Sequence, residues 1–106
     1  MSLLTGVVRT VARPPRIEGF DRFLFLGPHP DDIEIGAGAT AARLAAEGKK
    51  IRFVICTDGR YGTEGLEHPP EPEELAAWRR REALQSAACL GVEDVRFLAF
   101  SDGGFY

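Results

Sequence analysis

Two short apolar runs on either side of an alanine-rich segment place the strongest constraint on how this chain folds. Residues 23–26 are too few for a helix and stop at Gly27, so they predict a strand that is buried on both faces. Residues 51–56 form a second run, rich in β-branched residues. Residues 35–47 between them carry apolar residues at helical spacing, and Gly48 follows where a helix would end. A strand, a helix and a strand with short connections form two parallel strands with a right-handed crossover.

The same pattern continues along the chain. Residues 59–72 hold several glycines and prolines and no apolar period, which predicts a long loop after the second strand. A second helix is expected to begin at Pro72, with acidic residues in its first turn, and to end at Gly91. Residues 95–100 then predict a third strand. The fold class is therefore α/β with a parallel sheet.

Composition limits the classes of function. A length of 106 residues suits one domain, and a net charge of -3 offers no basic surface for nucleic acid or anionic lipid. No apolar run approaches the roughly 20 residues that cross a bilayer, and Arg9 interrupts any signal-peptide core. Cys56 and Cys89 lack metal-site or redox spacing, so we expect reduced, buried thiols. These features predict a cytoplasmic protein with a small-molecule partner and no membrane insertion.

The first residues are expected to differ from the rest. Pro14 and Pro15 disfavour a helix, so residues 1–19 are predicted to form an extended arm. The domain itself is expected to span residues 20–106.

Four ionisable residues crowd the connection between the first strand and the first helix: His29, Asp31, Asp32 and Glu34. Open parallel sheets bind ligands at this end of their strands. His29 and Asp32 are three residues apart, so a helical turn places both on one side, where they can reach a zinc-like ion. Asp31 then points away from the ion. A carboxylate beside the metal, but not bound to it, is placed to act as a general base that takes a proton from water.

Two other interpretations remain open from these residues alone. Asp31 or Asp32 could simply cap the helix, with His29 at a strand end. Acidic residues after the first strand of a small α/β domain also describe a non-enzymatic receiver or ligand-binding domain that holds Mg²⁺. A receiver has no need of His29.

Residues 28–40, PHPDDIEIGAGAT, resemble the hallmark of the LmbE-like de-N-acetylases, the group that includes N-acetylglucosaminyl-phosphatidylinositol (PIG-L) de-N-acetylase. Residues 57–62, Arg79 with Glu82, and residues 90–92 and 102–104 are similar to further family segments in the same order. The resemblance implies a Rossmann-like, three-layer α/β fold with a mostly parallel sheet, of which this chain holds three strands and two helices. It also implies a zinc-dependent hydrolase that removes acetyl from an N-acetylglucosamine-type substrate.

Carried over by position, the resemblance implies specific roles. His29 and Asp32 would be ligands of Zn²⁺ or another divalent metal, and Asp31 would be the general base. Arg79 and Asp102 would face the sugar.

The chain also departs from the family pattern. The motif usually has a glutamate directly after the second aspartate, whereas Ile33 intervenes here, so Glu34 is assigned a supporting role only. The family's third zinc ligand is a histidine well beyond the third strand, and His68, in a proline-rich loop, is expected to be exposed rather than ligating. We therefore expect residues 20–106 to be the amino-terminal part of one LmbE-like domain, either inactive alone or associated with another chain, as in a homo-oligomer.

Overall fold

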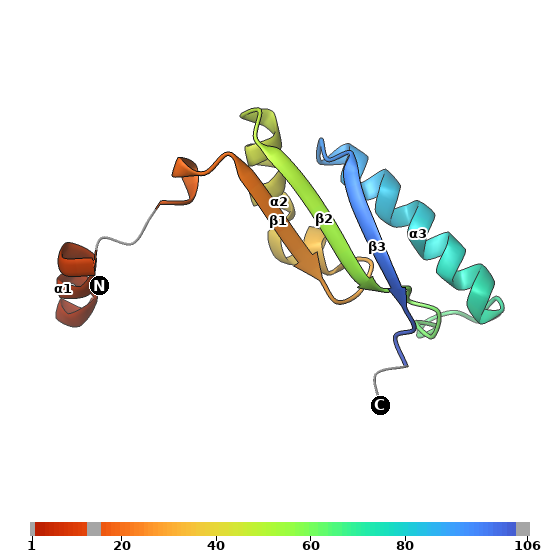
Figure 1. The fold of residues 1–106 in the computed structure, drawn as a ribbon. Coiled ribbons are helices and arrows are strands. Elements are labelled where there is room, and N and C mark those ends of the chain that lie inside the picture. Colours follow the sequence, from red (N-terminus) through yellow and green to blue (C-terminus); the bar gives the residue numbers. More distant parts are fainter. Residues whose placement is uncertain (1, 13–15, 104–106) are drawn as a thin grey trace.

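The computed structural model describes residues 2–12 and 16–103. Three strands, β1 (Arg22–Gly27), β2 (Lys50–Thr57) and β3 (Asp94–Phe100), pair in parallel in the order β1-β2-β3 (Figure 1). Helix α2 (Asp32–Ala46) joins β1 to β2, and α3 (Pro72–Cys89) joins β2 to β3. The predicted α/β fold with a parallel sheet is therefore confirmed.

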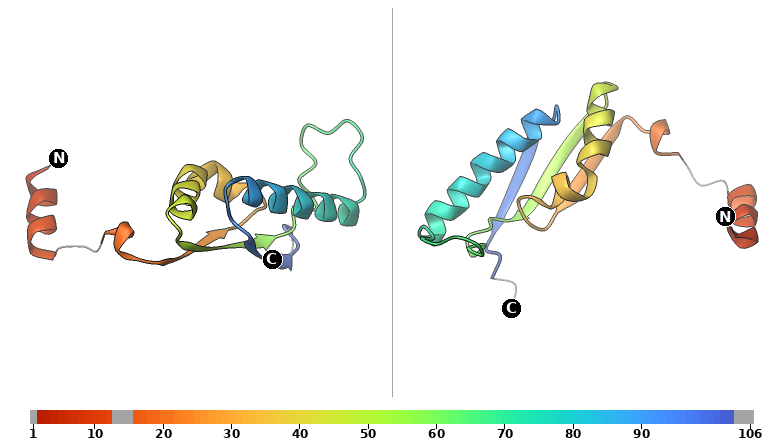
Figure 2. Two further views of the ribbon diagram at one scale, coloured as in Figure 1. Left: turned by 90° about the horizontal axis from the view of Figure 1, so that it is seen from above. Right: turned by 180° about the vertical axis from the view of Figure 1, so that it is seen from behind.

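Both helices lie on the same side of the sheet (Figure 2). The two crossovers run in one direction, from β1 towards β3, and right-handed crossovers that run in one direction place their helices on one face. The core fills the space between this face and the helices. Its largest fully buried side chains come from α2, β2, α3 and the turn before β3: Leu44, Phe53, Ile55, Leu75 and Val92.

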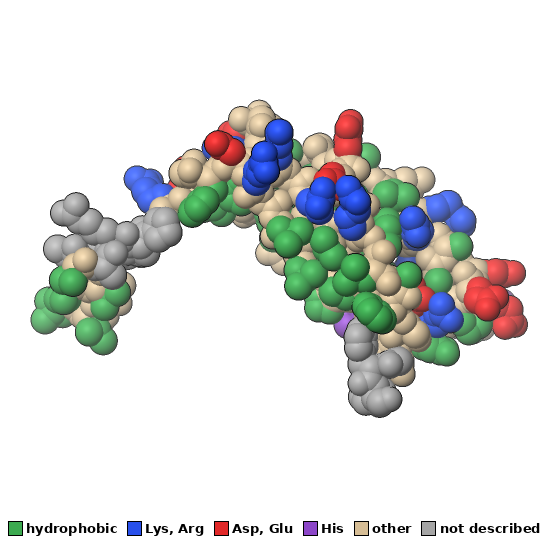
Figure 3. Space-filling model, in the orientation of Figure 1, with side chains coloured by type: hydrophobic (Ala, Val, Ile, Leu, Met, Phe, Trp, Pro, Cys, Tyr) green, Lys and Arg blue, Asp and Glu red, His purple; other side chains and the backbone are tan. Residues whose placement is uncertain are grey.

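The other face of the sheet is open. Leu24 is 65% exposed, Leu26 is 64% exposed and Leu98 is 51% exposed. Figure 3 shows the hydrophobic side chains gathered over this face, with Lys and Arg side chains towards one end of the strands. The prediction that residues 23–26 are buried on both faces is therefore wrong, because no helix within residues 2–12 and 16–103 covers the second face.

The amino-terminal segment also differs from its prediction. Helix α1 (Leu3–Ala12) is followed by a single 3-10 turn, η1 (Ile17–Gly19), so an extended arm is wrong for these residues. Apolar residues four apart, at positions 3, 7 and 11, have the spacing of one helix face, and all three side chains are exposed. Pro14 and Pro15 lie outside the described residues. In Figures 1 and 2, α1 lies apart from the sheet.

Glycine ends both crossover helices, as predicted. Gly48 and Gly91 have φ angles of 81° and 85°, a left-handed conformation that glycine adopts without strain. Helix α2 begins earlier than predicted, at Asp32, and a non-helical φ of -145° at Ala37 interrupts it.

The two cysteines differ in their exposure to solvent. Cys56 is half-buried, but Cys89 is exposed, so the prediction of two buried thiols is wrong for Cys89. Helix α3 places Cys89 on a face that the sheet does not cover.

Among the helices of the described residues, none has the length and apolar character needed to span a membrane.

Candidate functional site

The turn between β1 and α2 brings His29 and Asp32 into contact. Nδ1 of His29 lies 3.1 Å from Oδ2 of Asp32, and the same oxygen accepts the backbone N–H of His29 at 2.9 Å. Both side chains remain open to solvent, with 55% and 39% of their surface exposed. The structure thus places this pair on one side of the turn, as their spacing predicts, at the carboxyl end of the sheet.

Asp31 occupies the N-cap position of α2, yet its side chain makes no capping hydrogen bond. The side chain of Asp32 bonds back to His29 instead of forward into the helix. The capping interpretation therefore explains neither carboxylate. Within the described residues, the Asp31 side chain is exposed and has no hydrogen bond or ion pair, which leaves it free to accept a proton.

His29 and Asp31 open into a groove of about 390 Å³ between α2, α3 and the loop after β2. Arg79 lies in the same groove, where it donates to the carbonyl of Gly62 at 3.2 Å and pairs with Glu82 at 3.5 Å. Arg79 is therefore held by the loop rather than pointing freely into solvent. The remaining lining residues are Pro30, Glu34, Glu64, Ala83 and Ser86.

Glu34 contributes a carboxyl group with an altered proton affinity. Burial raises the pKa of Glu34, and the nearby charge of Asp31 raises it further. A hydrogen bond with Ser86 opposes this effect, and the charge of Asp32 adds to it. Glu34 thus holds its proton more readily than an exposed glutamate beside the same turn.

Asp102 lies on the other side of His29. It lines a second cavity of about 390 Å³ with Pro28, His29 and Cys56, among others. Its Oδ1 also accepts the backbone N–H of Tyr61 at 3.3 Å, so it joins the turn after β3 to the loop after β2. The structure therefore brings His29, Asp31, Glu34 and Arg79 into one groove and places Asp102 in a neighbouring one.

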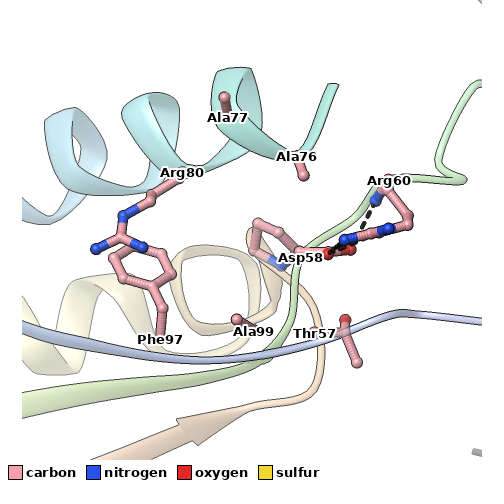
Figure 4. A pocket seen from close by; sticks show the side chains of 9 residues that line it. Thr57, Asp58, Arg60, Ala76, Ala77, Arg80, Phe97 and Ala99 are labelled. Carbon is pink, nitrogen blue, oxygen red and sulfur yellow. Dashed lines mark hydrogen bonds and ion pairs between the residues drawn. The ribbon is translucent and has the colours of Figure 1, made fainter. Parts of the chain in front are cut away.

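A third cavity, of about 310 Å³, lies between α3 and the ends of β2 and β3 (Figure 4). Asp58 holds Arg60 there by an ion pair of 2.7 Å, and the guanidinium of Arg80 lies 4.5 Å from the ring centre of Phe97. Pro30 lines both this cavity and the groove of His29. Residues 57–62 resemble a family segment, but that resemblance predicts no individual role for Asp58 or Arg60.

The donors available for a metal are few. No group of three His, Cys, Asp or Glu residues within the described ranges is placed to hold a metal ion. His29 and Asp32 supply one nitrogen and one oxygen donor, a combination that zinc accepts. His68 lies exposed in the loop, as expected.

The family model described as GlcNAc-PI de-N-acetylase (PIG-L) matches residues 24–106. A 1D-myo-inositol 2-acetamido-2-deoxy-alpha-D-glucopyranoside deacetylase from Thermomonospora curvata is 44% identical over 82 residues, which cover 73% of this chain and 28% of that protein. A diacetylchitobiose deacetylase from Thermococcus kodakarensis is 38% identical over 81 residues, covering 76% of this chain and 30% of that protein.

A solved structure agrees with these similarities. The N,N'-diacetylchitobiose deacetylase from Pyrococcus horikoshii superposes with a TM-score of 0.78 and 34% identity, covering 92% of this chain and 37% of that chain. The chain spans less than a third of the length of both curated relatives, at 28% and 30%. The similarity covers all three strands and both crossover helices nearly completely.

Proposed function

Since the chain belongs to the GlcNAc-PI de-N-acetylase (PIG-L) family, we propose that its His29 site serves the hydrolysis of the N-acetyl group of an N-acetylglucosamine-type substrate. The observation that carries the proposal is the contact of His29 with Asp32 beside an unpaired Asp31. A receiver would need the carboxylates but has no use for this histidine contact. Family membership likewise favours the deacetylase over the receiver.

We propose that His29 and Asp32 bind Zn²⁺ or another divalent cation, together with a donor from outside the described residues. The nitrogen and oxygen donors fit, and their solvent exposure leaves a path for an ion and a substrate. When bound, such an ion acts as a Lewis acid that polarises an amide carbonyl and favours deprotonation of water.

Asp31 is the proposed general base. Its carboxylate is exposed, lines the groove beside His29 and is not committed to another residue. It can therefore take a proton from a water that attacks the acetyl carbon and later return that proton to the departing amine. Glu34, which lies within about one helical turn of Asp31 and lines the same groove, is proposed to have a supporting role.

Arg79 and Asp102 are proposed to contact the sugar. They lie in the two cavities that meet at His29, so a sugar bound at His29 can reach both side chains. The relatives' names specify an inositol glycoside and a chitobiose as their substrates, both of which contain N-acetylated glucosamine units. We propose a small N-acetylated amino sugar of this class for the protein, and a cytoplasmic location, in keeping with its two free cysteines.

The test is acetate release by the complete gene product from an N-acetylglucosaminyl inositol and from diacetylchitobiose. We expect activity that is lost with a chelator and restored by Zn²⁺. Asp31→Asn should lower kcat by at least about 100-fold, whereas Asp21→Asn, a substitution at an exposed carboxylate remote from the groove, should not. Full activity of Asp31→Asn would rule out this base, and activity that survives complete metal removal would rule out the metal.

A further inference from the structure

Thr57, at the end of β2, is a buried polar residue with an unusual pair of bonds. It is 4% exposed, and among the described residues it is the one polar residue that is buried. Its hydroxyl donates to the carbonyl of Pro28 at 2.7 Å, and its backbone N–H donates to the same oxygen at 3.0 Å. A carbonyl has two lone pairs and can accept both bonds. Figure 4 shows Thr57 at the strand end.

The acceptor belongs to the peptide unit that leads into His29. The carbonyl of Pro28 and the N–H of His29 lie in one planar unit. Thr57 holds the carbonyl end, and Oδ2 of Asp32 accepts the N–H end at 2.9 Å. A peptide plane that is held at both ends has a fixed orientation, and this limits the directions that the His29 side chain can take.

The two bonds from Thr57 have different origins. β1 and β2 are paired up to Gly27 and Ile55, so the backbone bond to Pro28 continues the ladder of a parallel sheet. The hydroxyl bond is an addition that depends on the side chain. Only threonine and serine combine a side-chain donor with a size that fits this buried position, whereas valine has the same shape without the donor.

We propose that Thr57 is a positioning residue: its hydroxyl holds the Pro28–His29 peptide and thereby keeps Nδ1 of His29 against Asp32. This inference rests on the proposed function, because His29 and Asp32 are the residues proposed to bind the metal. His29 and Asp32 are the proposed metal ligands, so a contact that is held in place keeps the nitrogen and the oxygen donor together on one side of the turn. Thr57 thus contributes to metal affinity without touching the metal.

The experiment compares Thr57→Val, which removes the donor at nearly constant volume, with Thr57→Ser, which retains it. Thr40→Val serves as the control, because Thr40 is exposed on α2. The first readout is the ring ¹⁵N spectrum of His29 in the metal-free chain at about pH 8, where an ordinary histidine is neutral. The second is the dissociation constant for Zn²⁺, from the same spectra during titration.

We expect a single Nδ1–H tautomer in the unaltered chain, in Thr57→Ser and in Thr40→Val, and a mixture of tautomers in Thr57→Val. The Zn²⁺ dissociation constant should rise about tenfold in Thr57→Val, the lower end of the range for lost outer partners of metal ligands. If Thr57→Val does not fold, Thr57→Ala replaces it, since alanine and serine differ only in the hydroxyl.

Two results would overturn the proposal. One is a folded Thr57→Val protein with an unchanged ring spectrum and Zn²⁺ affinity, which would leave Thr57 only a packing role. The other is a mixture of tautomers already present in the unaltered chain. Failure of the unaltered chain to bind Zn²⁺ would instead count against the metal in the proposed function, and the ring spectrum would still decide the role of Thr57.

Discussion

Oδ2 of Asp32 contacts two nitrogens of His29, the ring Nδ1 at 3.1 Å and the backbone N–H at 2.9 Å. One carboxylate therefore orders both the side chain and the backbone of the histidine. The neighbouring Asp31 takes no part in this arrangement, although it is adjacent in sequence. The two aspartates are thus structurally distinct, and their substitution should have different effects.

Asp32→Asn should weaken Zn²⁺ binding by at least about tenfold, because it removes the negative charge and the acceptor that orders His29. Asp31→Asn should leave the Zn²⁺ affinity unchanged, since Asp31 does not contact the histidine. The two dissociation constants can be measured on the chain by competition with a coloured chelator. Equal losses in the two variants would contradict the division of roles between these residues.

The order of the three strands and the two crossover helices could be predicted from the sequence, because residues within or next to each element determine whether it forms a strand or a helix. The apolar run at residues 51–56 and the closing glycine Gly48 each depend on neighbours within a few residues. The spacing of His29 and Asp32 likewise predicted their contact, since one helical turn brings them together. Parallel pairing then follows from the helix that connects each strand to the next.

The errors concern contacts that sequence spacing does not report. Leu24 is as apolar as a core residue, and only the direction of the crossovers determines that its face of the sheet lacks a helix. Helix α1 ends before Pro14 and Pro15, so the two prolines do not interrupt its apolar spacing. The hydroxyl bond of Thr57 cannot be predicted from the sequence, because its acceptor is a backbone carbonyl 29 residues away.

The open face can be tested with two substitutions of the same kind. Leu44 is fully buried, so Leu44→Ala should lower the free energy of unfolding by about 2–5 kcal/mol. Leu24 is 65% exposed, so Leu24→Ala should cost about 0.5 kcal/mol or less. Urea unfolding of the 106-residue chain measures both. A similar cost at the two positions would mean that the open face is covered in solution.

Asp94 should make stability depend on pH. Its Oδ1 accepts from Arg96 at 2.9 Å and its Oδ2 from Arg52 at 2.8 Å, and these bonds, that of Arg96 first, lower the pKa of Asp94. The unfolded chain, with a value near 3.8, then binds a proton more readily than the folded chain. The stabilisation is therefore complete above this value and is lost as the pH falls through the lower folded value.

The free energies of unfolding of the unaltered chain and of Asp94→Asn, measured with urea, should therefore differ most at neutral pH and become equal in acid. Added salt should reduce the difference, because the group is exposed. Asp21→Asn is the control, since Asp21 is 93% exposed and pairs with Lys49 at the longer distance of 3.4 Å. A difference between the unaltered chain and Asp94→Asn that is constant from neutral pH into acid would show that the arginine contacts do not stabilise the strand pair.

Ala99 has a φ angle of 60°, in the left-handed region that a residue with a Cβ adopts at a cost of about 1 kcal/mol. It lies where the register of β2 with β3 shifts, before the turn that carries Asp102. Ala99→Gly should therefore leave stability equal or higher, and Ala99→Val should lower it by about 1 kcal/mol or more. Ala77→Gly, at an exposed position inside α3, is the control of opposite sign, because glycine costs about 0.5–1 kcal/mol in the middle of a helix. Thermal and urea unfolding measure all three variants, and a loss in Ala99→Gly as large as in Ala77→Gly would show that the left-handed backbone at Ala99 carries no strain.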